Sequence, residues 1–187
     1  MSRAGMLLCV FVLAGGVVAG PRQPVRAPTD DEIDDTVTLE DLIEPGDDSM
    51  RWTAESGAAI EGFVLDIHPA RPVGSCPAPR EGAETVLELT TDPNIFDPGH
   101  RFFVIVTTAV RQKMAAAGKD WRRSMLQARY LRRRVRIRGW LDFAKDQAPC
   151  AVNTADFGAA AARATAWQIR PMTSIKLVDP DAPGPTP

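Results

Sequence analysis

The chain has 187 residues, a formal net charge of −2 at pH 7 and 44% hydrophobic residues. This length favours one folded domain with tails over two domains, and the hydrophobic content is sufficient for a packed core. The 16 prolines, several of them near the two ends, exclude a chain that folds uniformly along its whole length.

Residues 1–20 have the pattern of an export signal. A basic start at Arg3 precedes an uncharged apolar run, and the run ends in Val17-Val18-Ala19, which fits the small-x-small rule for cleavage. The run is at the lower edge of the roughly 17–25 residues that span a bilayer. We therefore expect an exported chain, periplasmic or secreted, without a membrane span after cleavage. A retained membrane anchor is the alternative.

Two cysteines remain after removal of the signal, Cys76 and Cys150. A pair of cysteines in an exported chain predicts a disulfide, because the compartment is oxidising. The sequence has no CxxC, and its two histidines, His68 and His100, do not stand at a spacing typical of metal ligands. We therefore predict a disulfide between Cys76 and Cys150, no metal site and no cofactor.

Residues 21–51 are expected to form a disordered linker, Pro-rich at its start and acidic afterwards. Positions 30–50 hold ten Asp or Glu and no basic residue, so the segment combines high charge with little apolar surface. Within it, Thr38 and Asp41 fit a capping box, which would place the apolar residues of one helical turn on a common face. We interpret this as a transient turn in a solvated tail, and a docking peptide is the alternative.

The folded domain is expected over residues 52–178, followed by a disordered Pro-rich tail at 179–187. Period-two alternation, buried apolar runs and β-branched or aromatic residues predict five strands. The predicted strands are 58–68, 84–92, 101–109, 133–143 and 163–178. Pro171 cannot donate a ladder hydrogen bond, so the last strand must lie at an edge or carry a bulge there.

A helix is predicted between the third and fourth strands, over residues 110–128. Apolar side chains recur there at three- and four-residue steps and should share one face. They are Val110, Met114, Ala117, Trp121, Met125 and Ala128. Gly118 interrupts this pattern and Asp120 can start a new turn, so two short helices are the alternative.

The order strand, strand, strand, helix, strand, strand is that of a five-stranded OB-type barrel, so the predicted fold class is mainly β. Cys76 falls between the first and second strands, and Cys150 between the fourth and fifth. These two loops rise on the same side of an OB barrel, so the predicted disulfide is compatible with the fold. Closing such a long loop should stabilise the fold by up to about 4 kcal/mol.

Three segments of the C-terminal half resemble a known family. They are "VRIRGWLDF" (135–143), Asn153-Thr154 and "RATAWQIRPMTSI" (163–175). With these segments the chain looks like an uncharacterised family of exported bacterial OB-fold-like proteins. In that family the last strand usually ends in Trp-Glu-Ile-His-Pro, where this chain has Trp-Gln-Ile-Arg-Pro at 167–171.

Members of the same family tend to carry paired cysteines after the first strand and a histidine in the second. This chain has only Cys76 in the first of these places and no histidine in the second. The resemblance therefore implies an OB-like fold and export, and it implies no reaction.

Positive charge is concentrated before and within the fourth strand. Residues 111–138 hold eleven Lys or Arg and one acid, Asp120. Period-two alternation puts four side chains on the outward face of the fourth strand. They are Arg134, Arg136, Arg138 and Trp140. Together with Arg170 on the neighbouring strand, this set is suited to bind a polyanion through guanidinium contacts and aromatic stacking.

Two other interpretations of this face stay open. The arginines can be the solvated side of an ordinary strand, with their aliphatic stems covering Trp140. Alternatively, the acidic segment 30–50 can lie across the basic face of its own domain or of a neighbouring molecule, in a contact that salt weakens.

The sequence has no Gly-x-Ser-x-Gly, no phosphate-binding glycine loop and no His-rich metal motif, so no catalytic residue is predicted. We expect an exported, non-enzymatic OB-like binding module for a polyanion or a protein partner. Nucleic acid is a less expected ligand, because exported proteins rarely meet it. The alternative is a periplasmic hydrolase with a degenerate active site. A concave site with convergent carboxylates or histidines would favour the hydrolase, and a flat basic face would favour binding.

Overall fold

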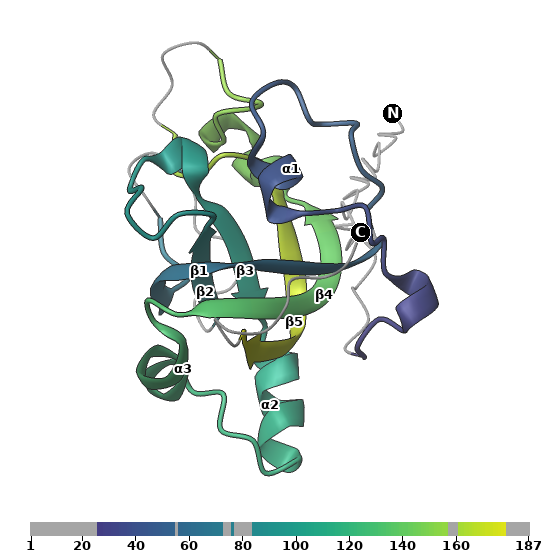
Figure 1. Cartoon of the computed structure of the whole chain (residues 1–187), viewed down its shortest axis with the longest axis vertical. Helices are drawn as coiled ribbons and strands as arrows, with labels where there is room; N and C mark the ends of the chain where they lie inside the picture. The colour runs from purple at the N-terminus through teal and green to yellow at the C-terminus, as the bar shows by residue number, and fades with distance from the viewer. Residues whose placement is uncertain (1–25, 55, 73–75, 77–83, 157–160, 179–187) are drawn as a thin grey trace, which may run out of the picture.

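The structure is a computed structural model, and it describes residues 26–54, 56–72, 76, 84–156 and 161–178 (Figure 1). The predicted signal at residues 1–20, the start of the predicted linker and the predicted tail at 179–187 lie outside the described residues.

Five strands close into a barrel in the order β1-β2-β3-β5-β4, and β4 pairs with β1 to complete it. The strands are β1 (Gly57–Pro69), β2 (Thr85–Thr90), β3 (Phe102–Val106), β4 (Arg134–Phe143) and β5 (Trp167–Leu177). Neighbouring strands are antiparallel except for the parallel pair of β3 and β5. The predicted OB-type barrel is therefore confirmed.

Two short helices connect β3 to β4, α2 (Thr108–Ala116) and α3 (Arg123–Tyr130). β3 ends earlier than predicted because the Thr107 side chain accepts a hydrogen bond from the backbone N–H of Val110 and so begins α2. Gly118 then adopts φ of 72°, a left-handed conformation that glycine reaches without strain and that ends the helix. The two-helix alternative is thus the right one.

The predicted apolar face of this region is only partly right. Val110 and Trp121 are buried, but Met125 is 45% exposed, and Leu126 and Tyr130 point to the core in its place. The physical reason is the break at Gly118: α3 starts anew at Arg123, so the helical phase of α2 does not continue into it.

β1 carries a bulge that changes which side its residues face. Its register with β2 shifts between Val64 and Asp66. Ile60 and Val64 before the bulge and Ile67 after it all lie in the main core, although their numbers have opposite parity. The dense apolar pattern of this strand predicts burial on both faces, and the change of phase accounts for part of that pattern.

The strand face opposite the main core is also partly covered on β1 to β3. All six residues of β2 are buried. A second, smaller apolar cluster consists of Ala70, Val86, Phe103 and Ile105. Since successive strand residues point to opposite faces, this outer cluster shares its face with Glu88, two residues after Val86.

The acidic segment, for which composition predicts disorder, packs against the barrel from residue 26 onward. Its one-turn helix α1 (Leu39–Ile43) has the predicted capping box of Thr38 and Asp41. Leu39 and Leu42 are fully buried in the main core, so this part of the linker prediction is corrected and the docking-peptide alternative applies to the chain's own barrel. In Figure 1 α1 lies on one side of the barrel, and α2 and α3 lie on the other.

The contacts of two residues of this segment, Leu39 and Asp48, explain why its composition is misleading. Gly62 in β1 leaves room for Leu39, since a Cβ there would lie 2.4 Å from Leu39 Cδ2. Asp48 is completely buried, and it accepts hydrogen bonds from Asn153 Nδ2 at 2.7 Å and from Trp167 Nε1, through its carbonyl oxygen, at 2.8 Å. A few apolar and polar anchors therefore outweigh the high charge of the remaining segment.

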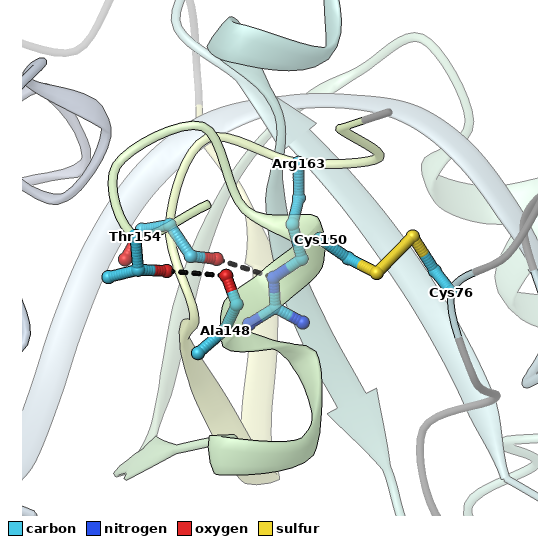
Figure 2. Close-up of a disulfide and its surroundings, with 6 residues drawn as sticks. Cys76, Ala148, Cys150, Thr154 and Arg163 are labelled. Atoms are coloured by element: carbon cyan, nitrogen blue, oxygen red, sulfur yellow. Dashed lines mark hydrogen bonds between the residues drawn. A yellow bond between two sulfur atoms is a disulfide. The ribbon is translucent and has the colours of Figure 1, made fainter. Parts of the chain in front are cut away.

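The rim of the barrel confirms two further predictions. The register of β4 with β5 shifts around Gly139, close to Pro171, so β5 is bulged where a bulge is predicted. Cys76 and Cys150 lie at disulfide distance, with sulfur atoms 2.28 Å apart and Cα atoms 5.7 Å apart (Figure 2). The loop between β1 and β2 is thus joined to the loop between β4 and β5.

Candidate functional site

The basic face predicted on β4 is less open than the sequence suggests. Arg134 and Arg136 are exposed, and Arg134 forms an ion pair with Glu61 at 3.2 Å. Arg138 forms an ion pair with Asp30 at 2.6 Å, so the N-terminal segment reaches across this strand. The hypothesis that acidic residues cover the basic face of their own domain therefore has one direct contact in its favour.

Trp140 does not offer the predicted stacking plane. Its side chain faces away from the main core, but the residue is only 4% exposed. Its Nε1 donates to the backbone oxygen of Arg26 at 2.9 Å, and the guanidinium of Arg26 lies 5.0 Å from the ring centroid. The prediction is wrong because the segment that covers this ring is ordered against the barrel, where its composition predicts disorder.

Arg170 also has another role than predicted. Its Nη2 donates to Glu84 Oε1 at 2.7 Å, and Glu84 is 2% exposed. Arg170 lies in β5, and this contact holds its side chain against Glu84, which directly precedes β2. The guanidinium is therefore not presented to a ligand together with the arginines of β4. Of the five predicted ligand-binding residues, Arg134 and Arg136 remain the exposed ones.

A concave site lies on another part of the barrel, on the outward side of β1 and β2 and beside the start of β3. It is an open cavity of about 480 Å³. Its lining residues are Leu65, Asp66, His68, Arg71, Glu88, Phe96, Arg101, Leu131 and Arg132. OB barrels commonly bind ligands near strands two and three and the adjacent loops, so the cavity has the expected location for this fold.

Strand geometry brings three of the titratable side chains together. Asp66 and His68 are two residues apart on β1, so they point to the same face. Glu88 on β2 is the cross-strand partner of Asp66. Their ligating atoms, one from each side chain, all lie within 4.8 Å of one another.

His68 and Glu88 form the buried part of this group. Their side chains are 8% and 9% exposed, and His68 Nε2 lies 3.1 Å from Glu88 Oε1. The other ring nitrogen, Nδ1, lies 2.8 Å from the backbone oxygen of Pro69. The second carboxylate oxygen of Glu88 accepts a hydrogen bond from Arg101 Nη1 at 3.2 Å. Every polar atom of the two side chains therefore has a defined partner.

The surroundings of His68 favour its protonated form. Burial by itself lowers the pKa of His68, but the hydrogen bonds to Glu88 and to the Pro69 carbonyl and the charges of Glu88 and Asp66 raise it above its ordinary value. The geometry agrees, because a carbonyl and an ionised carboxylate are both acceptors, and only the imidazolium can donate to both.

Arginines and an aromatic ring surround this group. Arg132 places its guanidinium 5.1 Å from the ring centroid of Phe96, which is 54% exposed. Arg101 also donates to the backbone oxygen of Phe96, at 2.5 Å. Arg71 is exposed at the start of the loop after β1. Among the described residues, three guanidinium groups thus line the cavity against two carboxylates, so this set of side chains is net positive.

Sequence reasoning misses this site for an identifiable reason. Metal and catalytic motifs are recognised by short spacings along the chain, and Glu88 is 20 residues away from His68. The signal that the sequence does contain is the pair Asp66 and His68, which share a face in any strand. Which face they share depends on the bulge before Asp66, and nothing in the alternation of the sequence locates that bulge.

The fold and the cavity define the class: an OB-type barrel with a concave, positively charged site beside its second strand. No protein-family model matches the chain, and the search of curated proteins finds no match. In the part of the chain that the structure describes, none of the helices has both the length and the apolar character needed to cross a membrane.

Proposed function

We propose that this chain is an exported OB-type binding module and that its ligand is a polyanion held in the cavity beside β2. The observation that carries the proposal is the convergence of Arg71, Arg101 and Arg132 in one cavity with the exposed ring of Phe96. Guanidinium groups bind phosphate, sulfate and carboxylate groups in a bidentate manner, which suits this ligand class. The predicted signal at residues 1–20 and the cysteine pair support export.

The proposed binding site is the cavity on β1 and β2, and not the face of β4 that the sequence predicts. The arginines of β4 lie on a strand surface that the N-terminal segment partly covers, whereas the cavity is concave and lies where OB barrels usually bind. A linear polyanion, such as a sulfated oligosaccharide or a single nucleic-acid strand, fits an open cavity better than a compact anion does. The resemblance to exported OB-like proteins is consistent with such a module.

Heparin and single-stranded DNA are the probes for this proposal, across a salt series. The double variant Arg71→Ala/Arg132→Ala should elute from both matrices at lower salt than the parent chain. For single-stranded DNA, log K falls with log salt at a slope of about −0.7 per phosphate contact. The loss of two contacts should therefore make this slope less negative by about 1.4. Arg101 is left unchanged because it also binds Glu88.

The matched control is Arg134→Ala/Arg136→Ala, which removes the same charge from the exposed part of β4. We expect this control to alter retention much less than the cavity variant. If the control lowers retention and the cavity variant does not, the binding site lies on β4 and the proposal for the cavity is wrong.

A second candidate function, a hydrolase, has one observation in its favour. Asp66, His68 and Glu88 converge in a concave site, which is the arrangement that favours an enzyme over a simple binding module. Among the described residues that line the cavity there is no Ser, Thr or Cys, so we propose water as the nucleophile. Release of p-nitrophenol from bis(p-nitrophenyl) phosphate by the parent chain, and its loss in His68→Ala, would support a phosphodiester hydrolase.

A further inference from the structure

We propose that Asp66, His68 and Glu88 form a binding site for one divalent transition-metal ion within the cavity. The ligating atoms would be one oxygen of each carboxylate and Nε2 of the imidazole. The proposal rests on the geometry of these three side chains and does not require that the proposed polyanion binding is right.

The strands hold the three ligands at a spacing that an ion can bridge. The ligating atoms lie within 4.8 Å of one another, and Nε2 of His68 is 3.1 Å from Oε1 of Glu88. Metal bonds of about 2 Å to nitrogen and oxygen place neighbouring ligand atoms about 3–4 Å apart, so small side-chain adjustments close the site. Two ligands come from one strand and the third from its hydrogen-bonded neighbour, so the backbone positions are fixed by the sheet.

The contacts behind the ligands are those that metal sites use to orient them. The backbone oxygen of Pro69 takes the Nδ1–H of His68, which leaves Nε2 directed at the site. Arg101 binds Oε2 of Glu88, which leaves Oε1 for the ion. A histidine and a carboxylate that each have an outer partner are already arranged for coordination.

The donor set determines the class of ion. Two carboxylates supply two negative charges against the two positive charges of the ion, and the imidazole favours transition metals over Mg²⁺ and Ca²⁺, which prefer oxygen ligands alone. Three protein ligands leave coordination positions open, and the cavity lies next to them. The arginines of the cavity make the approach of a cation less favourable, but they are suited to hold an anion at an open position.

The test uses the full mature chain without a polyhistidine tag, titrated with Co²⁺ by visible absorption and with Zn²⁺ by calorimetry. We expect one ion per chain, and at least tenfold weaker binding in His68→Ala and in Glu88→Gln. Asp66→Asn is the near-isosteric variant for the third ligand, and it should also weaken binding.

His100→Ala is the matched control, because His68 and His100 are the only two histidines of the sequence. His100 is exposed in the 3₁₀ turn η2 (Pro98–His100) and is not part of the group. This variant should bind Co²⁺ as the parent does. The circular dichroism and the thermal midpoint of each metal-free variant establish that it is folded, and Glu88→Gln and Asp66→Asn replace His68→Ala if that variant is not.

Three results would overturn the metal site: no binding to the parent chain, unchanged binding in folded Glu88→Gln and Asp66→Asn, or loss of binding in His100→Ala. The outcome is separable from that of the proposed function. If Co²⁺ binds as expected and heparin is not retained, the metal site stands and the polyanion proposal fails. If heparin is retained through Arg71 and Arg132 but no metal binds, the reverse holds.

Discussion

At the scale of single residues, Arg163 is the clearest case of a charged side chain that stabilises the fold from inside. It is completely buried, and its guanidinium lies 4.8 Å from the ring centroid of Phe103. It donates to the backbone oxygens of Thr165, Ala166 and Trp167 and thereby organises the turn into β5, beside the disulfide in Figure 2. Burial lowers the pKa of Arg163 to about 9, although the charges of Asp142 and Asp48 oppose this, so the group stays protonated at neutral pH.

We predict that Arg163→Met destabilises the fold by about 3–5 kcal/mol, because the buried carbonyl oxygens lose their donors. Arg163→Lys should recover only part of this loss, since an ammonium group lacks the planar fork that reaches several acceptors. Urea unfolding of both variants measures the effect. Arg134→Met, at an exposed position of β4, should change stability little, and an equal loss there would mean that the buried contacts are not the cause.

The pair of His68 and Glu88 should make stability depend on pH in the metal-free chain. The raised pKa of His68 means that the folded state binds its proton more tightly than the unfolded state, in which the pKa is about 6.5. The stabilising contribution is therefore complete below about pH 6.5 and is lost as the pH rises through the folded-state pKa. The charges that act on His68 are those of Glu88 and Asp66, with Arg101 on the far oxygen of Glu88.

Urea midpoints of the chelator-treated chain between about pH 5.5 and 8.5 should fall with rising pH. Glu88→Gln should flatten this dependence, because the neutral amide no longer favours the imidazolium. His100→Ala should leave it unchanged. A slope that survives in Glu88→Gln would assign the titration to another group.

At the scale of elements, the N-terminal segment has two functions that lie in different parts of it. Residues 26–34 cover the outer face of β4 through the Arg26 contact with Trp140 and the ion pair of Asp30 with Arg138. Residues 37–43 contribute Val37, Leu39, Leu42 and Ile43 to the main core. The first part makes exposed polar contacts that salt weakens. The second part supplies apolar side chains to the packed core.

Two truncations should separate these functions. Removal of residues 21–34 should leave a folded chain with an accessible Trp140, stronger acrylamide quenching and elution from heparin at higher salt. Removal of residues 21–50 should abolish cooperative unfolding, because two buried leucines at about 2–5 kcal/mol each approach the whole stability of a small domain.

The substitution Arg138→Ala in the shorter truncation is the control for the heparin result. It should cancel the gain in retention, since Arg138 is the cation that Asp30 pairs with. A longer truncation that unfolds cooperatively at the parent's midpoint would show that α1 does not belong to the core.

At the scale of the whole molecule, the barrel could be predicted from the sequence and the site could not. The difference is that the barrel follows from local patterns, whereas the site depends on the pairing of strands that are distant in sequence. Strand alternation and the order of elements are local properties of the sequence, and they predict the five strands and the cysteine pair. The contact of His68 with Glu88 depends on the β1 to β2 register, and one bulge decides whether Asp66 and His68 face the core or the cavity. The covering of Trp140 depends on a segment whose average composition indicates disorder, although a few of its residues are buried.

The cysteine pair should set the stability of the whole barrel. Cys76 and Cys150 are 74 residues apart in sequence, and a closed loop of that size constrains the unfolded chain by about 4 kcal/mol. We predict that the free energy of unfolding of Cys76→Ala/Cys150→Ala, measured with urea, is about 4 kcal/mol lower than that of the oxidised parent.

Treatment of the parent with reductant should produce a similar loss, and reductant should have no effect on the double variant. Cys76 is only five residues after Arg71, so the bond also limits how far Arg71 can move from the cavity. Reduced parent chain should therefore bind heparin more weakly at a temperature where it is still folded. Equal heparin retention before and after reduction would mean that Arg71 is positioned by β1 alone.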